Sequence, residues 1–145
     1  MYHPTTLLAA TLVLASSVRA IQLKYDNTYD TSDLSLDAVA CSNGPNGLET
    51  KYGYTTLGTV PTYPNLGAVY TVSGWDSPEC GACYAVTYQA TGVTVNILAV
   101  DKADTGFTVS QQAMDTLTAN HAVEFGQVEV SFEAVDPSQC QIPKS

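Results

Sequence analysis

Basic residues are scarce in this chain. Its 145 residues contain five Lys and Arg against fourteen Asp and Glu, which gives a formal net charge of −9 at pH 7. Proteins that bind phosphate backbones gather Lys and Arg on one face, whereas the lysines here are scattered at Lys24, Lys51, Lys102 and Lys144. The sequence therefore excludes the usual nucleic-acid partner, and its charge repels anionic lipids and acidic glycans such as pectin. A neutral or cationic polymer is electrostatically permitted.

Long apolar runs are also missing, apart from one stretch near the N-terminus. An apolar core at 7–15 is followed by small residues at the positions before Ala20 that a signal peptidase reads. The run is well short of the roughly 20 apolar residues that span a bilayer. We therefore predict a signal peptide over residues 1–20, in preference to a buried strand or helix, and a secreted single domain over 21–145. This domain, extracellular or in the cell wall, has 4 bases and 14 acids, or a charge of −10.

Cysteine is limited to four residues, an even number that leaves none without a possible partner: Cys41, Cys80, Cys83 and Cys140. In an oxidising compartment such a set predicts two disulfides, with three connectivities open. The Cys-x-x-Cys spacing would suggest zinc or a redox pair in a cytosolic protein. Zinc is disfavoured because His121 is the only histidine after residue 20 and there is no second close cysteine pair. We favour different partners for Cys80 and Cys83, since a bridge between them would close a tiny loop, and we expect neither a metal nor a cofactor.

The single tryptophan lies in the stretch 75–83, together with two carboxylates, a hydroxyl and two cysteines. A proline and a glycine within it exclude a helix or a central strand, so we interpret it as a tethered surface loop. A second loop at 41–47 has two Asn-Gly pairs around a proline, which favours positive φ. There Ser42 and Asn43 either serve turn geometry alone or present hydrogen-bonding groups to a ligand.

Short alternating segments indicate a β protein. Apolar and polar residues alternate at 21–25, 84–88 and 128–134, which is the period of a half-buried strand. A turn at Thr91-Gly92 leads into an apolar run at 93–100, so a hairpin with a buried second strand is predicted.

Weaker patterns predict the remaining elements. They indicate a short strand at 69–72, a short helix or turn at 30–40 behind Ser32 and Asp33, and a helix at 109–119 with a capping box of Thr108 and Gln111. Many short strands with few helices predict a small closed or nearly closed β-barrel.

Asp101 directly follows the apolar run and is the ionisable residue most suggestive of a site. A carboxylate there lies where a sheet edge meets a cleft, although an Asp that caps the following turn also fits the pattern. Glycan hydrolysis would need a second carboxylate roughly 5–9.5 Å away, and neighbouring motifs offer Asp76 and Asp104. A lone carboxylate can bind or strain a glycan without cleaving it.

Four sequence motifs, each present once, follow one another along this chain. They are Cys41-Ser42-Asn43-Gly44, the segment from Leu57-Gly58 to Pro64-Asn65, Gly74-Trp75-Asp76-Ser77-Pro78 with Cys80-Gly81-x-Cys83, and Val100-Asp101 with Gly106-Phe107. Together they resemble the cerato-platanin family of secreted fungal proteins over about Leu23 to Cys140. The resemblance implies a mainly β fold, a small six-stranded double-psi β-barrel like that of expansins, with one or two short helices. It also implies the disulfides Cys41–Cys80 and Cys83–Cys140.

The resemblance further implies a function without catalysis. It suggests binding of chitin-type N-acetylglucosamine oligomers in a shallow groove, cell-wall loosening, and recognition by a plant receptor as a defence elicitor or virulence factor. Asp101 corresponds to the central carboxylate, with Ser42, Asn43, Asp76 and Ser77 on flanking loops. The chain departs from the family pattern at 102–104 and at 51–54. The alternatives are a glycoside hydrolase or lytic enzyme that uses Asp101, and a surface-active, self-assembling protein, which would need a large exposed apolar patch.

Overall fold

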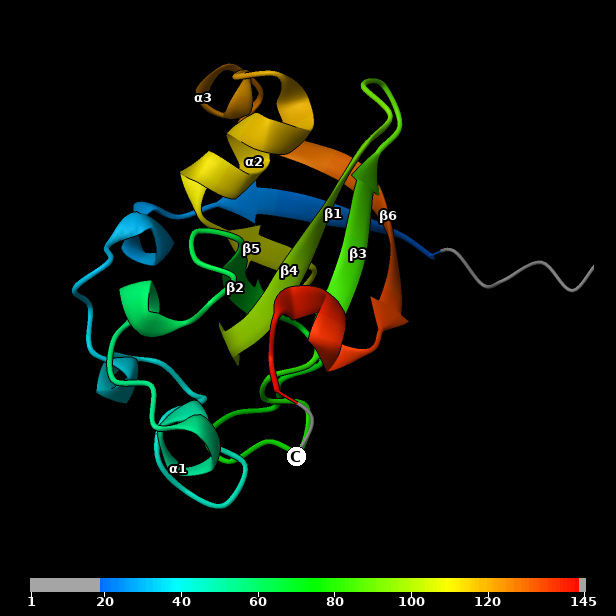
Figure 1. Ribbon diagram of the computed structural model, residues 1–145. Coiled ribbons are helices and arrows are strands. Elements are labelled where there is room, and N and C mark those ends of the chain that lie inside the picture. Colours follow the sequence, from blue (N-terminus) through cyan, green and yellow to red (C-terminus); the bar gives the residue numbers. More distant parts are fainter. Residues whose placement is uncertain (1–18, 144–145) are drawn as a thin grey trace, which may run out of the picture.

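Six β-strands close into a barrel in the computed structural model, which describes residues 19–143 (Figure 1). In chain order they are β1 (Arg19–Tyr25), β2 (Leu66–Val69), β3 (Cys83–Tyr88), β4 (Val93–Lys102), β5 (Phe107–Val109) and β6 (Gln127–Val135). Around the barrel the order is β1-β5-β2-β4-β3-β6, and β6 pairs with β1. The expected six-stranded, mainly β barrel is confirmed. The predicted signal peptide lies outside the described residues, except for Arg19 and Ala20, which begin β1.

Two very short strands complete the barrel through long-range pairing. β5 runs parallel to β1, β2 runs parallel to β4, and β2 and β5 are antiparallel to each other. Gly67 permits the close approach of β2 to β5, because a Cβ here would lie 2.2 Å from the carbonyl oxygen of Thr108. The strand predicted at 69–72 is wrong beyond its first residue, since β2 ends at Val69 and a turn follows at Tyr70 and Thr71.

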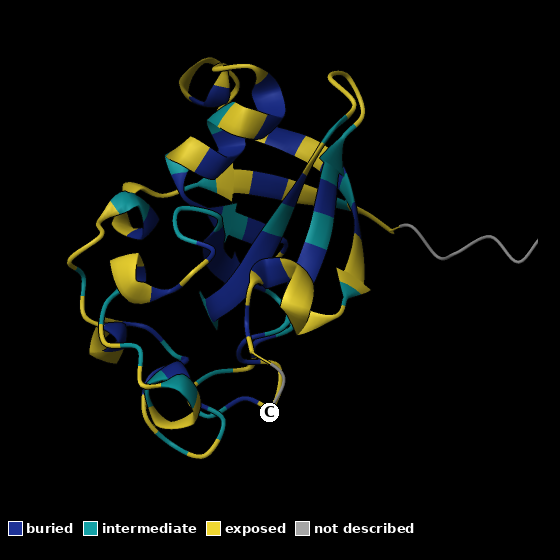
Figure 2. Ribbon diagram, in the orientation of Figure 1, coloured by how far each residue is buried: buried dark blue, intermediate teal, exposed yellow. Residues whose placement is uncertain are grey.

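Three aromatic side chains pack edge to face inside the barrel. The ring centroids of Tyr84, Phe107 and Phe132 lie between 5.2 and 6.1 Å apart, a geometry that adds to the burial of apolar area. Along β6, buried Val128 and Val130 alternate with exposed polar residues, as the sequence predicts. Figure 2 shows this alternation of buried and exposed positions along the strands.

β4 extends beyond the predicted apolar run and contains Asp101. It follows β3 through the predicted turn at Thr91-Gly92, and residues 97–100 are fully buried. β4 continues one residue past Asp101, to Lys102, because β2 pairs alongside both residues and continues the ladder.

The helix predicted at 109–119 is present as α2 (Gln111–Thr118), but its cap differs from the prediction. Ser110 is the N-cap, and its Oγ accepts a hydrogen bond from the Ala113 N–H at 3.0 Å. The predicted capping box is wrong because β5 runs on to Val109 and includes Thr108 as a strand residue.

Short helical turns occupy the loops between the strands. Two further α-helices are α1 (Leu48–Tyr52) and α3 (Ala122–Phe125), so there is one more than the one or two expected. The 3₁₀ turns are η1 (Asn27–Asp30), η2 (Leu36–Ala38), η3 (Leu57–Thr59) and η4 (Pro137–Cys140). η2 falls in the predicted region 30–40, but Ser35 caps it rather than Ser32 or Asp33. Figure 1 places α1 at one end of the barrel and α3 at the other.

The two disulfides join Cys41 to Cys80 and Cys83 to Cys140. This confirms the pairing implied by the family resemblance, and the zinc alternative is wrong because every cysteine sulfur is bonded to another. The bridged residues are 39 and 57 positions apart, and closing loops of this length contributes about 4 kcal/mol each in the chain-entropy model. Within residues 19–143, no helix is both long and apolar enough to cross a membrane.

Candidate functional site

Two loops, residues 42–47 and 73–79, meet beside the Cys41–Cys80 disulfide. The backbone N–H of Asn46 donates to Asp76 Oδ1 at 2.7 Å, and the Asn46 side-chain amide donates to the Asp76 carbonyl oxygen at 3.0 Å. Asp76 itself has a left-handed backbone with φ of 60°, a conformation that Asp tolerates better than most residues. The predicted site residue Asp76 therefore joins the two loops.

Trp75 presents its ring at the junction of these loops. The side chain is 63% exposed, yet its indole N–H donates to Asn43 Oδ1 at 2.7 Å. The ring also lies over Gly44, where a Cβ would come within 2.9 Å of it. A large exposed aromatic face is thus held in one orientation. The sequence prediction noted the single tryptophan but did not include it among the site residues. Its position, between the predicted ligand loop at 41–47 and the two cysteines Cys80 and Cys83, could have indicated a role in the site.

Ser42 and Ser77, two other predicted site residues, are buried, with exposures of 5% and 3%. Ser77 Oγ accepts from the Glu79 N–H at 3.2 Å and from the Ser73 N–H at 3.4 Å. The Ser42 carbonyl accepts from the Glu49 N–H at 3.1 Å. In this arrangement both serines shape the loops that carry the exposed Asn43 and Trp75, and direct contact of either with a ligand stays a prediction.

Asp101 is half-buried and accepts three hydrogen bonds. Its Oδ1 accepts from the backbone N–H groups of Ala40 and Lys102, each at 2.9 Å, and its Oδ2 accepts from the Tyr29 hydroxyl at 2.8 Å. Because each carboxylate oxygen has about two acceptor sites, these three donors leave one site on Oδ2 unused.

The same contacts tie Asp101 to the loops that carry Trp75. Ala40 precedes Cys41, whose N–H donates to the Val100 carbonyl at 3.1 Å. Asp101 therefore fixes the start of the 42–47 loop on β4. Burial and the hydrogen bond to Asp101 raise the pKa of the Tyr29 hydroxyl far above its ordinary value, so Tyr29 remains a donor.

The family model for cerato-platanin matches residues 21–142. This chain belongs to the cerato-platanin family. It is 45% identical over 118 residues to the heat-stable 19 kDa antigen of Coccidioides immitis, a match that covers 81% of this chain and 79% of the antigen. The fold agrees with that of cerato-platanin 3 from M. perniciosa, with a TM-score of 0.81 at 48% identity, over 86% of this chain and all of the other. The solution structure of the fungal elicitor cerato-platanin matches with a TM-score of 0.74 at 41% identity, over 83% and 96% of the two chains.

One pair of neighbouring carboxyl groups on this cerato-platanin fold is not among those considered for hydrolysis. Asp37 on η2 and Glu49 on α1 share a hydrogen bond, which, with smaller contributions from desolvation and from the charge of Asp37, raises the pKa of Glu49. Hydrogen-bonded carboxyl groups are closer than the roughly 5–9.5 Å that glycosidases use. Asp76 is held by Asn46, and Asp104 is exposed in the bend after β4.

Large exposed apolar side chains among the described residues are few. They are Trp75, Val123 and Phe125. Trp75 lies on the 73–79 loop, whereas the other two lie on α3, so a single broad apolar surface is not formed by them.

Proposed function

We propose that this protein is a secreted, non-catalytic carbohydrate-binding protein that stacks a sugar ring on Trp75. The observation that carries the proposal is an exposed tryptophan held rigid by the hydrogen bond to Asn43. Aromatic rings offer a large apolar face at low entropic cost, and the C–H face of a pyranose is its natural partner. Since the ring is already oriented, little ordering is lost when a ligand binds.

Polar groups on the 42–47 loop and on β4 favour a neutral glycan. The amide nitrogen of Asn43 is free to donate because only its oxygen is used by the indole. Asp101 keeps one acceptor site, which suits a hydroxyl or an acetamido N–H. With a charge of −10 over residues 21–145, an uncharged polymer is preferred to an acidic one. Chitin-type N-acetylglucosamine oligomers, which the family resemblance implies, meet all these requirements.

Binding of this kind accounts for wall loosening without hydrolysis. A protein that stacks on one glycan chain competes with the contacts between neighbouring chains, and no bond is cleaved. The similarity to a fungal elicitor extends the proposal to recognition by a plant receptor. Two disulfides agree with secretion, because such bonds persist in oxidising compartments.

The decisive experiment is calorimetric titration of N-acetylglucosamine hexamer into the protein and its variants. Trp75→Ala should weaken binding about tenfold, as expected for loss of a stacked aromatic ring, whereas Trp75→Phe should retain part of the affinity. Phe125→Ala is the matched control, because it removes an exposed aromatic ring from α3 at the other end of the barrel. Equal affinity of Trp75→Ala and the parent would refute the stacking site.

Two further measurements on the same samples test the ligand class and the absence of catalysis. Polygalacturonate should not retain the protein at any salt concentration, and retention that strengthens as salt falls would contradict the charge argument. Reducing ends should not accumulate with chitin oligomers. Steady release that is lost in Asp101→Asn would instead establish the enzyme alternative.

A further inference from the structure

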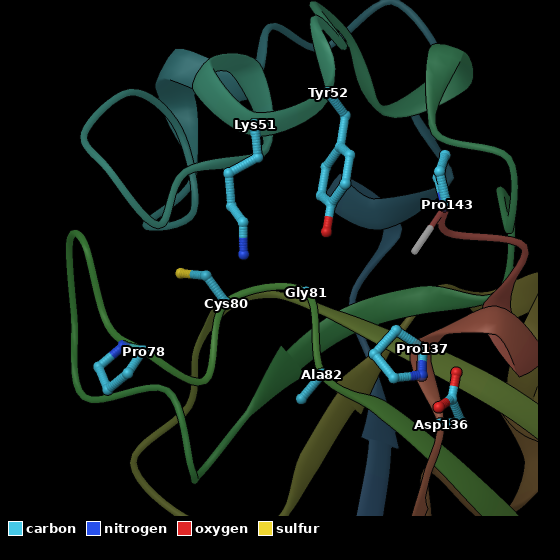
Figure 3. A pocket seen from close by; sticks show the side chains of 9 residues that line it. All are labelled: Lys51, Tyr52, Pro78, Cys80, Gly81, Ala82, Asp136, Pro137 and Pro143. Carbon is cyan, nitrogen blue, oxygen red and sulfur yellow. The ribbon is translucent and has the colours of Figure 1, made fainter. Parts of the chain in front are cut away.

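A cleft of about 510 Å³ lies between α1 and η4, and Trp75 is not among the residues that line it (Figure 3). Its floor is the turn from Cys80 to Ala82. This volume falls in the range of roughly 300–1,000 Å³ that is usual for small-molecule sites. The lining residues are Lys51, Tyr52, Pro78, Cys80, Gly81, Ala82, Asp136, Pro137 and Pro143.

Four of the nine residues that line the cleft carry rings, and polar groups make up much of the rest of its surface. Tyr52 stands over it with the phenol oxygen directed inward, as Figure 3 shows, and Pro78, Pro137 and Pro143 supply further apolar faces. The Tyr52 ring is stacked on Tyr54 with centroids 5.6 Å apart, which limits its rotation. Prolines have no N–H and expose mainly C–H groups, so these rings offer flat apolar faces within a lining that is otherwise polar.

The two ends of the cleft carry opposite charges. Lys51 extends into the cleft with its Nζ 5.8 Å from the centroid of the Tyr52 ring, and it forms no ion pair with any residue in the range 19–143. Asp136 lies on the other side, where its Oδ1 accepts from the Ser138 N–H at 2.9 Å. A ligand with one anionic end would therefore be oriented with that end toward Lys51.

The floor is rigid before any ligand arrives. Cys80 is fixed by the disulfide to Cys41, the Gly81 N–H donates to the Ala99 carbonyl at 2.9 Å, and the Ala82 N–H donates to the Glu79 carbonyl at 3.1 Å. A preformed cleft loses little conformational freedom when it is filled.

We propose that this cleft binds a small aromatic carboxylic acid, with its ring between Tyr52 and the prolines and its carboxylate on the Lys51 ammonium. The ring walls select the flat body of the ligand. The ammonium selects its charge, and the phenol of Tyr52 can donate to the second carboxylate oxygen. Trp75 does not line this cleft, and binding here does not depend on the proposed glycan binding.

The test is a titration of 4-hydroxybenzoate into ¹⁵N-labelled protein, followed by backbone amide shifts, with 4-hydroxybenzamide as the uncharged analogue. The acid should shift the amides of residues 51–52 and 80–82 and should saturate at concentrations of about 10 mM or below. Lys51→Gln should weaken binding of the acid about fivefold, the upper end for an exposed ion pair. It should leave binding of the amide unchanged, and Tyr52→Leu should weaken both ligands.

Lys24→Gln, which removes the same charge from β1, is the matched control. It should leave the affinity for the acid unchanged. Equal binding of acid and amide to the parent, or equal weakening by Lys24→Gln and Lys51→Gln, would overturn the proposal. Shifts confined to residues around Trp75, or no shifts at all, would overturn it as well.

Discussion

The carboxylate of Asp101 and the hydroxyl of Tyr29 form one structural unit. Asp101 receives three donors, and the only one from a side chain is the Tyr29 hydroxyl, 72 positions away in the sequence. Asp101 thereby acts first as a positioning residue for the loop that begins at Cys41. A substitution at Asp101 alters both this loop and any direct ligand contact, whereas Tyr29→Phe removes a single hydrogen bond and leaves the carboxylate in place.

Tyr29 should make the stability of the protein depend on pH in the alkaline range. Burial first, and then the hydrogen bond to Asp101, raise its pKa in the folded state above the ordinary value of 10.0. The folded protein therefore holds the hydroxyl proton above pH 10 while the unfolded chain releases it. The contribution is complete below pH 10 and is lost as pH rises above it, with a slope of up to about 1.4 kcal/mol per pH unit.

Urea unfolding of the parent and Tyr29→Phe between about pH 8 and 11 measures this effect. Below pH 10 the variant should be less stable by about 1 kcal/mol, the usual net contribution of one hydrogen bond. Above pH 10 the difference should shrink and then reverse in sign. The pKa of Tyr84 is also raised, chiefly by burial. Its effect on the free energy of unfolding is the same in both proteins and cancels in the difference between them. A difference that stays constant across this range would contradict the assignment.

At the level of elements, α2 depends on a cap that also joins two parts of the chain. Ser110 is fully buried; its Oγ accepts from the Ala113 N–H and donates to the Pro64 carbonyl. Asp30 of η1 accepts from the Gln111 and Gln112 N–H groups, at 2.8 and 3.1 Å. The N–H groups in the first turn of α2 are therefore satisfied by Ser110 and Asp30, and Ser110 in turn is bonded to Pro64.

Ser110→Ala should lower the free energy of unfolding by about 1–3 kcal/mol, because it removes the cap and leaves the half-buried Pro64 carbonyl with the Leu66 N–H as its donor. Thr108→Ala is the matched control. The sequence pattern predicts Thr108 as the cap, whereas in the structure Thr108 is a half-buried strand residue. Thr108→Ala should therefore lower the free energy of unfolding by less than Ser110→Ala does. Thermal or urea unfolding decides between them, and a larger cost for Thr108→Ala would refute the observed cap.

For the whole molecule, the disulfides hold different regions. Cys41–Cys80 fastens the two loops that carry Trp75 and Asn43, whereas Cys83–Cys140 fastens η4 to β3. Both close long segments, and both should contribute similarly to global stability.

The paired variants Cys41→Ser/Cys80→Ser and Cys83→Ser/Cys140→Ser separate global from local effects. Each should lower the free energy of unfolding by about 4 kcal/mol. Because the chain has one tryptophan, native-state fluorescence reports on Trp75 alone. Only the first variant should change the emission maximum and its quenching by acrylamide. Identical changes in both folded variants would show that Cys41–Cys80 does not hold Trp75 in place.

Much of the barrel is encoded locally. Alternation with a period of two predicts β1, β3 and β6, and an apolar run with a turn before it predicts β4, because each strand buries one face or both. Four cysteines in a chain with a signal-like N-terminus predict that the cysteines are oxidised to two disulfides. The pairing of the cysteines, by contrast, came from the family resemblance.

Other features were decided by contacts that no local pattern contains. β2 and β5 have four and three residues, too few for a periodic signal, and they exist as strands because distant partners supply their hydrogen bonds. Asp101 belongs to β4 because β2 pairs alongside it, and Ser110 replaces Thr108 as the cap because β5 extends to Val109. The orientation of Trp75 is set by Asn43, 32 positions away. Composition and periodicity determine which residues are buried when the chain folds. The closure of the barrel determines which polar groups still need hydrogen-bond partners and which aromatic rings stay exposed.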